Sequence, residues 1–149
     1  MKKILVAVDG SPSSKKAAEK AALIADSLDA EVTLINIITE TVTTPSNVLS
    51  SSLPMEQLQE MMDQEEKRLK VNSQKILDDA AVFFEEKGME VQTVIQYTNP
   101  ADKICDYAAE EGFDLIVLAD KGHGVKRFLL GSISDKVVRH ADVSVLVVK

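Results

Sequence analysis

Five short apolar segments, separated by stretches with helical periodicity, constrain the fold of this chain more than any other feature of its sequence. Residues 3–8, 31–38, 115–118 and 143–148 are continuous apolar runs rich in β-branched side chains. Such runs are typical of strands buried on both faces in a parallel sheet. Residues 89–97 instead alternate apolar and polar side chains, which predicts a strand with one buried face at a sheet edge.

Helical periodicity fills each gap between the expected strands. Two helices follow a capping residue and a proline, a pair that suits a helix start because the first helical position needs no N–H. The helix after residues 31–38 carries many Glu, Gln and Lys residues in its first half, which is therefore expected to project into solvent or onto a partner. The expected helices begin at Ser11-Pro12, Met55, Asn99-Pro100 and Ile133, and they end near Leu28, Lys87, Gly112 and His140.

This order of elements predicts an α/β protein with a Rossmann-like, open, parallel five-stranded sheet. Right-handed crossovers place helices on both faces of such a sheet. With 149 residues and 45% hydrophobic content, the chain is expected to form a single domain over residues 1–149. Residues 39–54 are rich in Ser, Thr and Pro and lack periodicity, which predicts a long flexible loop.

Composition narrows the classes of partner. A formal net charge of −7 argues against a general nucleic-acid or acidic-membrane binder. One cysteine excludes an intramolecular disulfide and suits a reducing compartment. No stretch approaches the ~20 apolar residues of a membrane helix, and the apolar run after Lys2-Lys3 is too short for a signal peptide. The cytoplasm is the expected location.

The stretch from Asp114 to Ser134 indicates a phosphate site. A strand leads into a loop with Gly122 and Gly124, and Gly131-Ser132 then opens a short helix. Glycines let backbone N–H groups approach an anion, and a helix N-terminus supplies free donors and partial positive charge. The alternative is that the glycines only turn the chain and Ser132 only caps a helix. Three basic residues of this loop either contact phosphate or face solvent: Lys121, Lys126 and Arg127.

Asp9 ends the first strand and provides a second part of the same candidate site. Ligands of open α/β sheets bind beyond the carboxyl ends of the strands, where the strand order reverses. Asp9 and the glycine loop would face each other there if the first and fourth strands are neighbours. This convergence favours a nucleotide over a merely structural loop.

Three segments resemble the universal stress protein family. They are KKILVAVDGS, NPADKICDYAAEEGFDLIVLAD and GVKRFLLGSISDKVVRHADVSVLVVK, and the similarity covers the chain outside residues 39–72. The resemblance implies the strand order 3-2-1-4-5 and, commonly, a homodimer. The family has two branches, of which one binds ATP.

The glycine motif of the ATP-binding branch is Gly, two residues, Gly, nine residues, Gly, then Ser or Thr. Gly122, Gly131 and Ser132 fit this pattern. Ala119 stands where the first glycine belongs, and only eight residues separate Gly122 from Gly131, with Gly124 beside the gap. A methyl group at Ala119 would crowd a nucleotide whose backbone contact there is close.

The resemblance implies roles for individual residues. Asp9 would lie near the ribose or hold a Mg²⁺ ion bridged to phosphate, and ATP, ADP or AMP would be the ligand. The adenine would be bordered by Ala7, Val8 and Ile37, and the phosphates by Ser132, Ile133 and Ser134. The expected nucleotide-binding residues are Ala7, Val8, Asp9, Ile37, Ala119, Gly122, Gly124, Gly131, Ser132, Ile133 and Ser134.

Three functions remain open on the sequence alone. The first is a stress-response regulatory protein that holds ATP at the carboxyl ends of strands one and four without efficient turnover. The second is a dimeric interaction module without nucleotide. The third is a slow ATPase, although no residue near the motif is an obvious base and His123 has no evident orienting partner. A homodimer is expected through the apolar terminal strand Val143–Val148, which should lie at a sheet edge.

Overall fold

The computed structural model describes residues 2–42, 53–120 and 130–149. Strands and helices alternate along these residues, as the apolar pattern predicts. The elements are β1 (Lys3–Ala7), α1 (Pro12–Leu28), β2 (Glu31–Ile38), α3 (Met55–Glu85), β3 (Val91–Tyr97), α4 (Pro100–Glu110), β4 (Leu115–Ala119), α5 (Ser132–His140) and β5 (Ser144–Val148).

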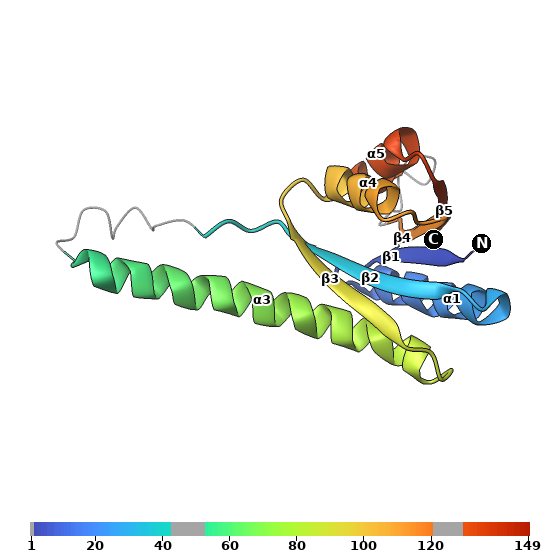
Figure 1. The fold of residues 1–149 in the computed structure, drawn as a ribbon. Helices are drawn as coiled ribbons and strands as arrows, with labels where there is room; N and C mark the ends of the chain where they lie inside the picture. Colours follow the sequence, from blue (N-terminus) through green and yellow to red (C-terminus); the bar gives the residue numbers. More distant parts are fainter. Residues whose placement is uncertain (1, 43–52, 121–129) are drawn as a thin grey trace.

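The five strands form one parallel sheet in the order β3-β2-β1-β4-β5. The expected α/β class, strand order and edge position of β3 are therefore confirmed. In Figure 1, α1 and α3 cover one face of the sheet, and α4 and α5 cover the other. Because β1 is parallel to and paired with both β2 and β4, the carboxyl ends of these three strands lie next to one another.

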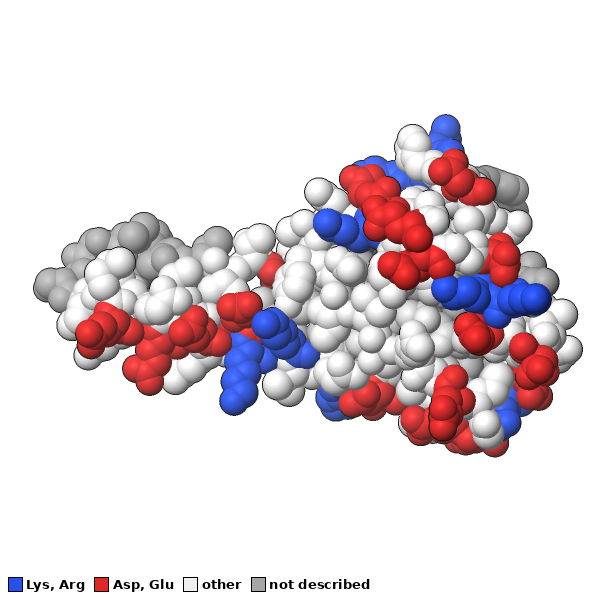
Figure 2. Space-filling view, viewed as in Figure 1, with Lys and Arg blue, Asp and Glu red and all other residues white. Residues whose placement is uncertain are grey.

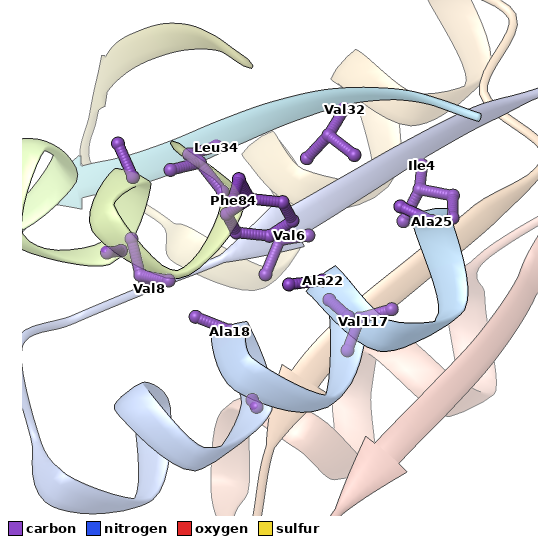
Figure 3. Close-up of a cluster of buried hydrophobic side chains, with 14 of the residues drawn as sticks. Ile4, Val6, Val8, Ala18, Ala22, Ala25, Val32, Leu34, Phe84 and Val117 are labelled. Carbon is purple, nitrogen blue, oxygen red and sulfur yellow. The ribbon is translucent and has the colours of Figure 1, made fainter. Parts of the chain in front are cut away.

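Two apolar clusters hold the layers together. On one face, the fully buried Val6 and Val117 lie in the same cluster as Phe84 of α3 and the alanines of α1 (Figure 3). On the other face, Leu5 and Ile116 pack with Val137 of α5. Small side chains on α1 let that helix approach the sheet closely, which is why its buried positions are nearly all alanine.

The helix starts follow the sequence only in part. Ser11 caps α1 as expected, because its Oγ accepts a hydrogen bond from the Ser14 N–H at 3.1 Å. Asn99 precedes α4 but makes no side-chain capping bond, since its backbone is left-handed (φ 46°) and not extended as capping requires. The expected Ser132 cap is also wrong: Gly131 holds the cap position and Ser132 is the first helical residue.

The first half of α3 projects beyond the sheet, as its composition predicts (Figure 1). Acidic side chains gather on this projecting part in Figure 2. The second half packs on the sheet through Leu69, Leu77 and Phe84, all buried. Leu77 is fully buried, whereas its neighbour Ile76 is half-buried and lines the cavity described below.

The expected flexible loop over residues 39–54 lies mostly outside the described residues. Residues 39–42 and 53–54 are neither helix nor strand, and residues 43–52 are not described. Within the described part of the chain, no helix is both long and apolar enough to cross a membrane.

A cavity at the carboxyl ends of the strands

A cavity of about 440 Å³ opens where β1, β2 and β4 end, between the start of α5 and the flank of α3. Its volume lies within the range of about 300–1,000 Å³ that is typical of small-molecule sites. The predicted site residues among the described ones all line it: Ala7, Val8, Asp9, Ile37, Ala119, Gly131, Ser132, Ile133 and Ser134. Gly122 and Gly124 lie outside the described residues, as do Lys121, His123, Lys126 and Arg127. Four segments far apart in sequence therefore converge on one hollow.

Asp9 is fixed by the start of α1. Its Oδ1 accepts a hydrogen bond from the Ser11 N–H at 2.9 Å, and its own N–H donates to Ser14 Oγ at 3.0 Å. Ser14 is buried and also lines the cavity. The helix cap and the Asp9 turn thus form one unit, which holds the Asp9 backbone at the rim of the cavity.

A buried polar pair that the sequence reasoning missed supports the wall beside Val8. Asn36 Nδ2 donates to the Val8 carbonyl at 2.7 Å, and Ser73 Oγ donates to Asn36 Oδ1 at 2.6 Å. Both side chains are buried and line the cavity, and buried polar groups of this kind need partners. The pair joins the end of β1 to β2 and α3. The available signal was Asn36 itself, an amide side chain within the apolar run Leu34–Ile38.

The remaining wall is largely apolar. Side chains from β2, α3, α4 and β4 contribute to it, and Pro100 adds the start of α4. An apolar wall beside a few fixed polar groups suits a ligand with a flat apolar face and polar edges. Besides Pro100, the apolar residues outside the predicted set are Ile35, Ile38, Leu69, Ile76, Ile104 and Leu118.

The start of α5 contains a second residue that the sequence reasoning missed. Asp120, the first residue after β4, accepts a hydrogen bond from the Gly131 N–H at 2.9 Å through Oδ1. Ser134 Oγ lies 3.5 Å from the same carboxylate oxygen and 3.2 Å from the Gly131 carbonyl. Ser134 is buried, so its hydroxyl is engaged within the first turn of α5. The Asp120 carboxylate thus already accepts a hydrogen bond from the Gly131 N–H, one of the backbone donors at the start of α5 that were expected to face phosphate.

The described residues add neither a metal-binding cluster nor a thiol to the lining of the cavity. Among the described residues, no group of three or more His, Cys, Asp or Glu side chains could hold a metal ion. Cys105 lies on α4 away from the cavity lining, and burial raises the pKa of its thiol. It packs as a small, partly buried side chain against the apolar cluster on that face of the sheet.

The model of the universal stress protein family matches residues 1–149. The universal stress protein YxiE of Bacillus subtilis is 34% identical over 148 residues, with 99% of this chain and 98% of YxiE covered. The universal stress protein MJ0531 of Methanocaldococcus jannaschii is 34% identical over 149 residues, with 99% of this chain and 82% of MJ0531 covered.

Solved structures share the fold. UspA from Lactobacillus plantarum superposes with a TM-score of 0.69 at 27% identity, covering 99% of this chain and 97% of UspA. The universal stress protein from Archaeoglobus fulgidus in complex with dAMP has a TM-score of 0.69 at 20% identity, with 100% of this chain and 98% of that protein covered. A universal stress protein in complex with cAMP has a TM-score of 0.66 at 21% identity, with 99% of this chain and 96% of that protein covered.

Proposed function

This chain belongs to the universal stress protein family, and we propose that it is a regulatory protein that binds an adenine nucleotide in the cavity without efficient turnover. The glycine motif suggests ATP, with ADP and AMP as related ligands. The observation that carries the proposal is the convergence of Asp9, Ile37, Ala119 and Gly131 on one hollow of about 440 Å³. The dAMP and cAMP complexes of two proteins with the same fold support it. A cytoplasmic location agrees with this role.

The cavity offers a distinct place for each part of a nucleotide. The apolar side chain of Ile37 and the backbone around Val8 suit the flat face and polar edge of adenine. Asp9 suits a ribose hydroxyl, because a carboxylate accepts hydrogen bonds. The first amides of α5 suit phosphate, because the first N–H groups of a helix have no partner within it.

Magnesium fits this arrangement only together with the nucleotide. Mg²⁺ prefers oxygen ligands and is commonly bound by one or two carboxylates plus substrate phosphates. The Asp9 carboxylate at the cavity is a donor of that kind, while the described residues contain no cluster that would hold the ion alone. When bound, the ion would neutralise phosphate charge.

The described lining of the cavity supports the proposal of slow turnover. Phosphoryl transfer needs a positioned water or hydroxyl together with charge stabilisers. Two carboxylates line the described cavity, Asp9 and Glu40. Asp9 Oδ1 already accepts a hydrogen bond from the Ser11 N–H. The exposed Glu40 forms an ion pair with Arg68 of α3, in which Oε2 and Nη2 are 3.5 Å apart. Neither is held as a general base over the start of α5.

Calorimetric titration of the protein with AMP, ADP and ATP in the presence of Mg²⁺ tests this function. We expect saturable binding of at least one nucleotide, and phosphate release well below the ~1–10³ s⁻¹ of ordinary enzymes. Absence of binding to all three would favour an interaction module. Rapid release that Asp9→Asn abolishes would instead establish an ATPase.

We also propose a homodimer through β5. This strand pairs only with β4 within the described sheet, so its other edge is open, and open edges invite pairing with another chain. The Asp120 N–H donates to the Val148 carbonyl at 2.9 Å, which directs the backbone polar groups of Val148 toward β4. Because these groups alternate along a strand, those of Val145 and Val147 face the open edge.

The substitution Val145→Pro is expected to convert the dimer to a monomer. Proline removes one N–H that faces outward and leaves the ladder to β4 intact, since edge strands tolerate proline at such positions. Light scattering coupled to gel filtration measures the change. Thr93→Pro on the opposite edge strand β3 is the matched control and should leave the dimer unchanged. A monomeric parent protein, or equal loss in both variants, would contradict the interface.

A further inference from the structure

Asp120 places a negative charge at the end of the cavity where phosphate is proposed to lie. Its Oδ1 accepts from the Gly131 N–H at 2.9 Å and lies 3.5 Å from Ser134 Oγ. Both Gly131 and Ser134 line the cavity, and Asp120, which does not line it, is in contact with both. The carboxylate therefore holds the position on the first turn of α5 that an anionic ligand would otherwise take.

Within the described part of the chain, the side-chain contacts of this carboxylate are with neutral groups, the Gly131 N–H and the Ser134 hydroxyl. Asp135, also in the first turn of α5, is paired with Arg139 through Nε at 3.0 Å. Among the residues that the structure describes, no lysine or arginine forms an ion pair with Asp120. A phosphate approaching the Gly131 amide must displace the carboxylate or lie beside it.

We infer that Asp120 is a selectivity-determining residue that makes the cavity favour adenosine and AMP over ATP. The inference rests on the proposed function and specifies its ligand. Repulsion grows with each phosphate, because ATP brings more negative charge to the start of α5 than AMP, and adenosine brings none. For a phosphate charge roughly 7 Å from the Asp120 carboxylate, and an effective dielectric constant of about 20, the repulsion weakens binding by a factor of tens. Solvent and Mg²⁺ reduce this effect to about tenfold.

Asp120→Asn tests this inference with little change in shape. The amide oxygen of asparagine still accepts the bond from the Gly131 N–H, so the start of α5 is preserved while the charge is removed. Asp26→Asn is the matched control, because it makes the same chemical change at an exposed position near the end of α1, away from the cavity lining. Asp120→Ser is a second variant in case the asparagine disturbs folding, which thermal unfolding monitors.

Calorimetric titrations with adenosine, AMP and ATP are compared at ~0.05 M and ~0.5 M NaCl. In the parent, AMP is expected to bind at least as tightly as ATP, and the discrimination should shrink at high salt. Asp120→Asn should tighten ATP binding about tenfold while leaving adenosine unchanged, and Asp26→Asn should change neither. A merely structural role for Asp120 would not produce this dependence on phosphate number and salt.

Three results would count against the inference, and one of them also removes the proposed function. Parent protein that binds ATP more than about tenfold tighter than AMP overturns the selectivity. So does an ATP-to-adenosine affinity ratio that Asp120→Asn and Asp120→Ser leave unchanged within about twofold. Absence of binding of all three ligands to the parent and to every variant overturns the nucleotide function and the inference with it, whereas a parent that binds AMP and gains ATP binding only in the Asp120 variants supports both.

Discussion

The substitution Gly131→Val is expected to remove nucleotide binding, with a loss of at least about 100-fold in affinity, or roughly 3 kcal/mol. Gly131 lines the cavity and stands immediately before the first helical residue of α5. A β-branched side chain there would take up ligand space and hinder approach to the first amides of the helix. The backbone of Gly131 is extended (φ −61°, ψ 162°), which valine adopts readily, so the fold should survive.

Calorimetry with adenosine and AMP measures this loss, and thermal unfolding verifies the fold. Ser132→Ala should be milder, since it removes at most one hydrogen bond to a charged group, worth about 1.5–3 kcal/mol. Ala109→Val introduces the same side chain at an exposed position near the end of α4, away from the cavity lining, and should have no effect. Equal affinity of Gly131→Val and the parent would show that the ligand does not approach the start of α5.

The substitution Gly10→Ala is expected to lower the free energy of unfolding by about 2–3 kcal/mol. Gly10 has a φ of 83°, a left-handed conformation that costs an L-residue roughly 1–2 kcal/mol. A Cβ atom there would lie 3.1 Å from Ile76 Cγ1 on α3, so Ile76 must also shift, at a further cost of about 1 kcal/mol. Ile76 lines the cavity, and ligand affinity should therefore fall as well.

Gly88→Ala separates the two contributions. Gly88 has a φ of 76°, but among the described residues no heavy atom beyond Gly88 and its two chain neighbours lies within 4 Å of the position that its Cβ would take. Urea unfolding should therefore show a smaller loss, from backbone strain alone. Equal losses for Gly10→Ala and Gly88→Ala would mean that the contact with Ile76 contributes nothing. Adding Ile76→Ala to Gly10→Ala should remove the clash, which a double-mutant cycle measures.

The sequence predicted the fold well because its signals are local and repeated. Apolar runs identified four strands and the alternation of apolar and polar side chains identified β3, although β3 begins at Val91 and not at Met89. The pairing of β1 with β4 brought Asp9 toward the start of α5, as the position of both segments at strand ends predicts. The strand order itself came from the family resemblance and is confirmed by the sheet.

The details of the site were harder to predict because they depend on contacts between distant segments. Asn36 and Ser73 are separated by 37 residues, and nothing in either segment alone indicates their hydrogen bond. Asp120 and Gly131 meet only because α5 begins against the end of β4. Residue preferences also misplaced two helix caps, since Asn99 adopts a left-handed backbone and Gly131 takes the position expected of Ser132.

A crystal structure of the protein grown with AMP tests most directly whether the cavity is an adenine-nucleotide site. We predict AMP in the hollow at the ends of β1, β2 and β4, with the base beside Ile37, the ribose at Asp9 and the phosphate toward the start of α5. Gly131→Val crystals grown in the same way should lack the ligand. An empty cavity in the parent at saturating AMP, or AMP bound elsewhere, would contradict the proposed function.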